Sequence, residues 1–135
     1  MNVLLVGEDA PLLEGLSQSF AALGYLPRVS ESLHWARESA QRQPPLVAVI
    51  SGDLASDSPA DVMAIKLAPG GVIVLYHGTV DARPIIAPSL QRAVMADLTL
   101  PLERNRLMAL AQHVTERIRV TGRAQRRTPP EQQAF

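Results

Sequence analysis

The chain of 135 residues contains no cysteine, and only 4% of its residues are aromatic. The absence of cysteine excludes a disulfide framework and thiolate chemistry. No apolar run reaches the roughly 18–20 residues of a membrane-spanning helix, and the opening stretch MNVLLVGEDA becomes acidic too early for a secretory signal. We therefore expect a cytoplasmic protein without a membrane partner.

Motifs for nucleotides and nucleic acids are also missing. No G-x-x-x-x-G-K sequence is present, so neither ATP chemistry nor any cofactor is predicted for this segment. The formal net charge is zero, but residues 1–100 hold 6 Lys/Arg and 10 Asp/Glu, whereas residues 101–135 hold 7 and 3. The basic end lacks the interleaved aromatics and the helix-turn-helix pattern of a DNA-binding segment, so we expect no direct contact with nucleic acid.

Five short apolar runs alternate with segments of helical periodicity. In the first helical segment Asp9 is a candidate N-cap and Gly24 a candidate stop, and Ser30 or Ser32 is placed to cap the second. Such alternation, with right-handed crossovers, gives a parallel sheet with helices on both faces. We predict an α/β, flavodoxin-like fold of five parallel strands in the order 2-1-3-4-5. The predicted strands are residues 2–6, 25–29, 46–50, 72–76 and 94–98.

The later helical segments are less regular. A helix over residues 82–93 is expected to be shortened or broken by Pro84 and Pro88. A long helix from Leu102 carries an apolar stripe, and after Gly122 the sequence RAQRRTPPEQQAF is typical of an exposed linker. The predicted organisation is one domain over residues 1–121 and a linker over residues 122–135.

The predicted site lies where loops leave the carboxyl ends of the strands, because those ends meet at one edge of an open parallel sheet. Polar and charged side chains gather in these loops. They are Glu8 and Asp9 after the first strand, Ser51 and Asp53 after the third, Tyr76 and His77 after the fourth, and Thr99 before Leu100–Pro101 after the fifth.

These same loops carry a resemblance to a known family. The stretch NVLLVGEDAPLLEGLSQSFAALGY resembles the opening of a response-regulator receiver domain. PPLVAVISGD, GVIVLYHG and LTLP stand where a receiver has its phosphoacceptor strand, its Ser/Thr strand and its Lys-Pro pair. The resemblance covers residues 1–121 and implies a CheY-like fold.

The chemistry of active receivers is not preserved in this resemblance. Such receivers hold Mg²⁺ with two adjacent carboxylates and the acceptor Asp, and contact the phosphoryl oxygens with a hydroxyl and a Lys. Here Gly7 and Glu8 occupy the positions of the acidic pair. Asp9 can replace the missing carboxylate only if the alignment shifts by one residue. The acceptor falls on Ser51 or Gly52, and Asp53 reaches that place only with one or two extra residues. We therefore predict a vestigial phosphorylation pocket without catalytic or metal-ligating residues, formed by Gly7, Glu8, Asp9, Ser51, Gly52, Asp53, Tyr76 in the Ser/Thr place and Leu100 in the Lys place.

A narrower resemblance rests on VISGDLAS, ADLTLPLERNRLMALAQHV and RRTPPEQQAF. Together these are similar to the N-terminal domain of FleQ/FlrA-type flagellar master regulators, which are atypical sigma-54 activators. The resemblance implies a degenerate receiver that precedes an AAA+ ATPase and a DNA-binding domain of the same chain. It implies a non-enzymatic regulatory and dimerisation module of a bacterial transcriptional activator, without phosphorylation.

Two other functions remain open at this point. One is a true phosphorelay receiver that uses Asp53, and the other is a small flavodoxin-like enzyme with His77 near Ser51 and Asp53. We also predict a homodimer in which the last helix forms an isologous contact. The alternative is that its stripe packs on the domain's own sheet and the domain is monomeric. The predicted interface residues are Leu107, Leu110, Val114 and Ile118.

Overall fold

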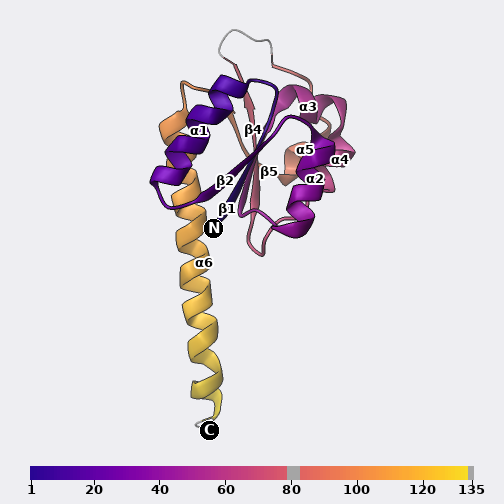
Figure 1. Cartoon of the computed structure of the whole chain (residues 1–135). Coiled ribbons are helices and arrows are strands. Elements are labelled where there is room, and N and C mark those ends of the chain that lie inside the picture. Colours follow the sequence, from indigo (N-terminus) through magenta and orange to yellow (C-terminus); the bar gives the residue numbers. More distant parts are fainter. Residues whose placement is uncertain (79–82, 134–135) are drawn as a thin grey trace.

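The computed structural model describes residues 1–78 and 83–133, with side chains described as far as residue 121. Strands and helices alternate through the first part of the chain, and the last helix is by far the longest (Figure 1). The elements are β1 (Asn2–Val6), α1 (Ala10–Ala22), β2 (Leu26–Ser30), α2 (Leu33–Arg42), β3 (Val47–Ser51), α3 (Gly52–Asp57), α4 (Pro59–Met63), β4 (Val72–His77), α5 (Pro88–Ala93), β5 (Val94–Thr99) and α6 (Arg104–Gln133).

All five strands form one parallel sheet in the order β2-β1-β3-β4-β5. This confirms the predicted sheet and its strand order. Helices α1 and α6 cover one face, and α2, α3, α4 and α5 lie on the other (Figure 1). The carboxyl ends of β1, β3 and β4 therefore meet at one edge, as predicted for the site.

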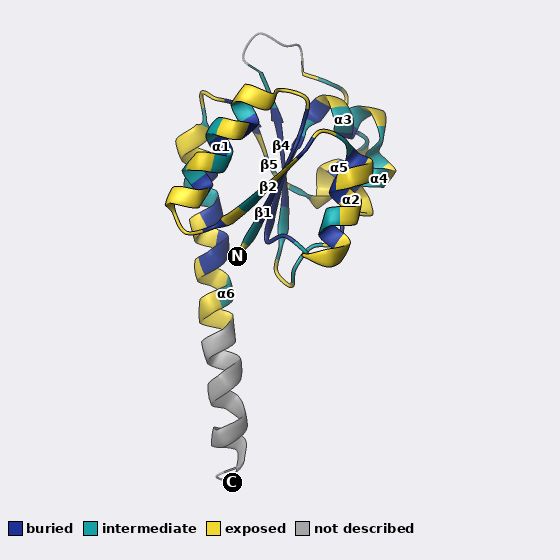
Figure 2. Ribbon diagram, in the orientation of Figure 1, coloured by how far each residue is buried: buried dark blue, intermediate teal, exposed yellow. Residues whose placement is uncertain are grey.

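Side chains alternate between the two faces along each central strand. In β3, Val47 and Val49 belong to the core under α1 and α6, whereas Ala48 and Ile50 belong to the core under the other helices. All four are fully buried, and the central strands are dark blue in Figure 2. Burial on both faces explains why this run is apolar throughout instead of alternating with polar residues.

The first two helices begin at the N-caps that their sequences indicate. The Asp9 carboxylate accepts a hydrogen bond from the Leu12 N–H at 3.3 Å, and the Ser32 hydroxyl accepts one from the Trp35 N–H at 3.3 Å. Ser32 is therefore the cap of α2, which decides between the two predicted serines. After α1 the chain turns at Gly24 with φ of 90°, a left-handed conformation that glycine adopts without strain.

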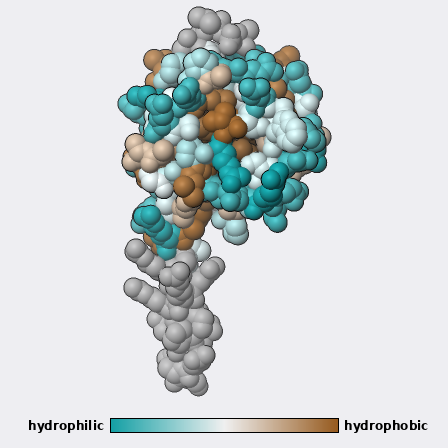
Figure 3. Space-filling model, viewed as in Figure 1, coloured by the Kyte–Doolittle hydropathy of each residue, from teal (hydrophilic) through white to brown (hydrophobic). Residues whose placement is uncertain are grey.

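The edge strand β2 tolerates a proline because of the direction of its backbone groups. The Leu26 N–H bonds to the Met1 carbonyl, so the backbone groups of Pro27 point away from β1. No ladder hydrogen bond is lost, and one outward donor is removed from the free edge. Leu26 and Val29 are exposed on this strand, with Arg28 between them. Figure 3 shows apolar patches interrupted by hydrophilic side chains on this side of the molecule. Proline and charge at an edge disfavour pairing with another strand.

The helices after β3 differ from the prediction. A short helix, α3, begins at Gly52 where a polar loop was expected. In place of a helix over residues 82–93, α5 has six residues and begins at Pro88; the predicted start at residue 82 lies outside the described residues. Pro84 and Pro88 explain the shortening, because each disfavours a helical conformation in the residue before it.

The last helix differs from the prediction at both its buried stripe and its end. Leu107 is 0% exposed and Val114 is 2% exposed, because both pack in the core under α6, whereas Leu110 and Ile118 pack only partly against it. Assigning Leu107 and Val114 to a dimer contact was therefore wrong. The backbone of α6 continues as a helix to Gln133, so the segment after Gly122 that was expected to be an exposed linker has a helical backbone. Among the described residues no helix, α6 included, is both long and apolar enough to cross a membrane.

Candidate functional site

A hollow of about 320 Å³ lies at the carboxyl ends of β1, β3 and β4. It includes most of the polar side chains that the sequence placed at this edge of the sheet. The strands bring these residues together from distant parts of the chain, because parallel strands end at the same edge. The hollow is lined by Glu8, Asp9, Leu12, Ser51, Asp53, Leu54, Asp57, Tyr76, His77 and Gly78.

Four exposed carboxylates make the hollow acidic: Glu8, Asp9, Asp53 and Asp57. Asp53 lies in the first turn of α3 and not at the tip of β3, where Ser51 is the last residue. Within the described part of the chain none of the four forms an ion pair. Nor do three or more His, Cys, Asp or Glu side chains among the described residues form a group able to hold a metal ion.

Tyr76 occupies the space that a side chain at position 7 would need. Tyr76 is only 5% exposed, and its ring reaches across to the end of β1. A Cβ atom added to Gly7 would overlap the Tyr76 hydroxyl oxygen and lie 3.1 Å from the ring carbon Cζ. A side chain at position 7 therefore requires the Tyr76 ring to move.

A second glycine of the predicted pocket, Gly52, is closely approached by its neighbours without being overlapped. A Cβ atom at Gly52 would lie 3.1 Å from Cγ of Pro84 and 3.2 Å from the carbonyl oxygen of Tyr76. Gly52 is buried, and its neighbours are a proline ring and a strand carbonyl, which move little. A carboxylate at this position has no room unless the segment that carries Pro84 shifts.

Leu100, which the sequence resemblance puts in the place of the receiver lysine, belongs to the hydrophobic core. It is 1% exposed and packs with the residues under α1 and α6. The following peptide bond, Leu100–Pro101, is cis. Position 100 therefore supplies no positive charge to balance the carboxylates of the hollow.

The Tyr76 phenol in the hollow is a weaker acid than an exposed tyrosine. Burial, followed by the negative charges of Asp9 and Asp53, raises the pKa of Tyr76 to about 12. The same charges repel any further anion, including a phosphoryl group. The hydroxyl therefore remains neutral over the physiological range.

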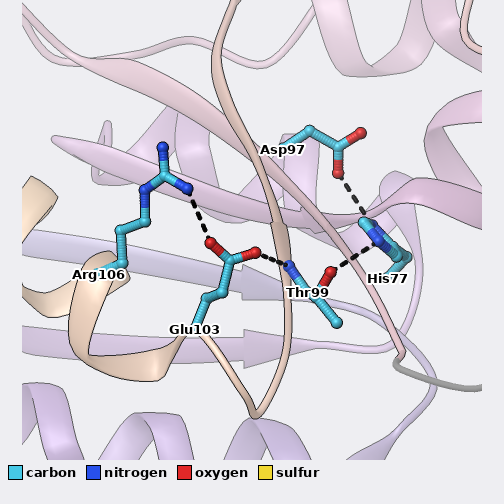
Figure 4. A network of polar contacts seen from close by, with 5 residues as sticks. All are labelled: His77, Asp97, Thr99, Glu103 and Arg106. Carbon is cyan, nitrogen blue, oxygen red and sulfur yellow. Dashed lines mark hydrogen bonds and ion pairs between the residues drawn. The ribbon is translucent and has the colours of Figure 1, made fainter.

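His77 is held by two side chains of the neighbouring strand β5 (Figure 4). Its Nδ1 lies 3.0 Å from Asp97 Oδ1, and its Nε2 lies 2.9 Å from Thr99 Oγ1. The imidazole is 8% exposed, whereas the Asp97 side chain is 43% exposed. His77 thus pairs with Asp97 and Thr99, and not with the Ser51 and Asp53 considered from the sequence.

The same network continues into the start of α6. The Thr99 backbone N–H donates to Glu103 Oε1 at 2.9 Å, and Arg106 Nη1 donates to Glu103 Oε2 at 2.8 Å. These hydrogen bonds, that of Thr99 first, hold the pKa of Glu103 below its usual value. The end of β4 is therefore connected through β5 to the first turn of α6 (Figure 4).

Of the predicted pocket residues, Glu8, Asp9, Ser51, Asp53 and Tyr76 line the hollow, but the sequence did not indicate this hydrogen-bond network. A signal was available, because Asp97 and Thr99 are two apart on a strand and so lie on one face. What the sequence did not show is that His77 on β4 lies opposite Thr99, a pairing fixed by the sheet register.

Known structures share this architecture, although no protein-family model and no curated protein sequence matches the chain. A CheY-like receiver domain protein from Methanospirillum hungatei JF-1 has a TM-score of 0.72 at 17% identity, over 87% of this chain and 96% of that one. NtrX from Brucella abortus, in complex with ADP, has a TM-score of 0.65 at 14% identity, over 92% of this chain. The beryllofluoride-activated NtrC4 receiver domain dimer has a TM-score of 0.60 at 15% identity, over 86% of this chain and 97% of that one.

These similarities define the class of fold: the chain has the CheY-like receiver fold of response regulators. The predicted fold is thus confirmed. The chain spans 28% of the length of NtrX, which is a larger protein than a receiver domain alone. At these identities the similarity establishes the fold and leaves the activity to be argued from the site.

Proposed function

We propose that this chain is a receiver-like regulatory module that acts without phosphorylation in a bacterial transcriptional activator. The observation that carries the proposal is the occupied pocket. Tyr76 stands where a side chain at Gly7 would lie, and Pro84 stands against Gly52. The space in which an active receiver gathers its carboxylates around Mg²⁺ is thus taken by a phenol and a proline ring.

The charge of the site supports the same proposal. A phosphoryl group added here would meet four carboxylates and no lysine, because Leu100 is buried in the core. Like charges at close range raise the free energy of a dianionic group strongly in a partly buried site. The module is accordingly proposed to be non-enzymatic and to signal through its surfaces.

The wider context of the proposal comes from resemblance. NtrX and the NtrC4 receiver share the fold, and the motifs quoted above resemble FleQ/FlrA-type flagellar regulators. We propose that AAA+ and DNA-binding domains follow in the same protein, that its targets are flagellar genes, and that the module forms a homodimer with α6 at the contact. Because Leu107 and Val114 are buried, the exposed parts of α6 and its neighbours would form that contact.

The test is phosphorylation in vitro. Purified protein is incubated with acetyl phosphate and Mg²⁺ beside an active receiver as positive control, and intact masses are measured. We expect the mass to remain unchanged, and beryllofluoride to leave the backbone amide shifts around Gly52 unmoved. An adduct of one phosphoryl group that disappears in Asp53→Ala would overturn the proposal.

That opposite result would support a second candidate, a phosphorelay receiver. One observation favours it: Asp53 is exposed and lines the same hollow as Glu8 and Asp9. These three carboxylates come from the two loops that bind Mg²⁺ in an active receiver. The Asp53→Ala arm of the experiment separates the two candidates.

A further inference from the structure

An apolar groove of about 400 Å³ lies between α1 and the turn that precedes α6. It is distinct from the acidic hollow, although Asp9 lies at the border of both. Figure 1 shows α1 beside the start of α6 on the same face of the sheet. Leu12 and Gly15 of α1 form one wall, and Pro101 forms part of the other.

Gly15 leaves this groove open in the middle of a helix. It is the sixth of the 13 residues of α1, and a Cβ atom built there meets no other atom within 4 Å. The packing of the chain itself therefore does not require glycine, which is a poor helix former. The missing side chain does allow a neighbouring group to approach the helix backbone closely.

A large apolar side chain stands exposed beside the groove. Leu102 follows Pro101 in the turn between β5 and α6, and it is 78% exposed. It is therefore not packed into the groove of its own chain. An exposed leucine next to an apolar groove gives this surface both a projecting side chain and a place to receive one.

The groove carries one acidic and one basic residue, so its charges are complementary to those of a second copy. Asp9 and Arg104 both line it, and neither forms an ion pair within the described residues. One Asp9 oxygen caps α1 through the Leu12 N–H, which leaves the other oxygen for a partner. A contact with two-fold symmetry contains every residue pair twice. The acidic residue of each copy can therefore pair with the basic residue of the other copy.

We propose that this groove binds a second copy of the chain. Leu102 of each copy inserts beside the partner's Gly15, and Asp9 of each copy pairs with the partner's Arg104. The inference rests on the homodimer of the proposed function and gives it a surface made by α1 and the start of α6. It replaces the predicted contact through Leu107 and Val114, which the fold uses internally.

Cross-linking tests the contact directly because the chain has no cysteine of its own. Equal amounts of Gly15→Cys and Leu102→Cys are mixed and oxidised, with Val120→Cys plus Leu102→Cys as the control pair. Val120 is also exposed on α6 but lies more than four turns along the helix from its start. We expect a mixed disulfide dimer from the first pair well in excess of the control. Equal yields from both pairs would overturn the proposal.

Sedimentation of the uncross-linked protein up to about 100 µM provides the affinity. Gly15→Gln places a helix-forming side chain in the groove, and Arg104→Glu sets like charges against each other. Each is expected to weaken dimerisation about tenfold or more, whereas Arg119→Glu, elsewhere on α6, leaves it unchanged. A strict monomer, or a dimer indifferent to both groove variants, refutes the contact. The phosphorylation assay does not depend on association, so failure here is separate from failure of the phosphorylation-independent function.

Discussion

Replacing Gly7 by alanine is the sharpest test of how the pocket is blocked. The added Cβ atom would overlap the Tyr76 hydroxyl oxygen and approach Cζ to 3.1 Å. Tyr76 is 5% exposed and its backbone is paired on both sides, with Ser51 and with Leu98. The ring therefore has little freedom to withdraw. Overpacking of this kind costs about 1–3 kcal/mol in the free energy of unfolding.

The hydroxyl can be removed separately, which allows a double-mutant cycle. In Tyr76→Phe the overlapping oxygen is absent, and the remaining 3.1 Å approach to Cζ requires a shift of only a few tenths of an ångström. Gly7→Ala should then cost little when it is combined with Tyr76→Phe. We expect a coupling free energy of about 1–2 kcal/mol between the two positions, above the ~0.5 kcal/mol limit of ordinary additivity.

Urea unfolding followed by far-ultraviolet circular dichroism measures all four free energies at a low protein concentration. Gly15→Ala is the matched control, because its new Cβ atom meets nothing within 4 Å. That variant should gain up to about 1 kcal/mol from helix propensity. If Gly7→Ala were equally destabilising with tyrosine and with phenylalanine at position 76, the reasoning that Tyr76 blocks this position would be refuted.

Two further predictions concern the same pocket. Because the pKa of Tyr76 is raised from 10.0 to about 12, its contribution to stability is complete below pH 10 and is lost as the pH rises towards 12. The expected loss in the free energy of unfolding is about 1–2 kcal/mol, measured by urea unfolding across that pH range. Tyr76→Phe should not show this loss. The same dependence on pH in both proteins would contradict the assignment of the loss to Tyr76. Leu100→Lys with Tyr76→Thr and Gly52→Asp should destabilise the protein by several kcal/mol without restoring tight Mg²⁺ binding, because Lys and Asp would enter packed positions. Unchanged unfolding with tight binding in calorimetry would show that the pocket was never repacked.

Much of the fold follows from local signals in the sequence. The apolar run ending at Ile50 predicted a strand buried on both faces, and the Asp9 and Ser32 caps predicted where α1 and α2 begin. These features depend on side chains within a few residues of one another, through hydrogen bonds to backbone N–H groups and through alternation along a strand. The missing lysine at Leu100 could likewise be read directly, because a receiver needs a charge at that position.

The tertiary structure decided which side chains occupy the space left by the missing groups. Only the packing shows that Tyr76 lies over Gly7, that Pro84 lies against Gly52, and that His77 pairs with Asp97 and Thr99. It also decided that Leu107 and Val114 belong to the core, whereas Leu102 is exposed. These contacts join residues from different strands and helices, so they depend on sheet register and helix placement. A periodic pattern along the chain identifies an apolar stripe on a helix. Whether the sheet of the same domain or another molecule covers that stripe depends on the area that the assembled fold leaves uncovered.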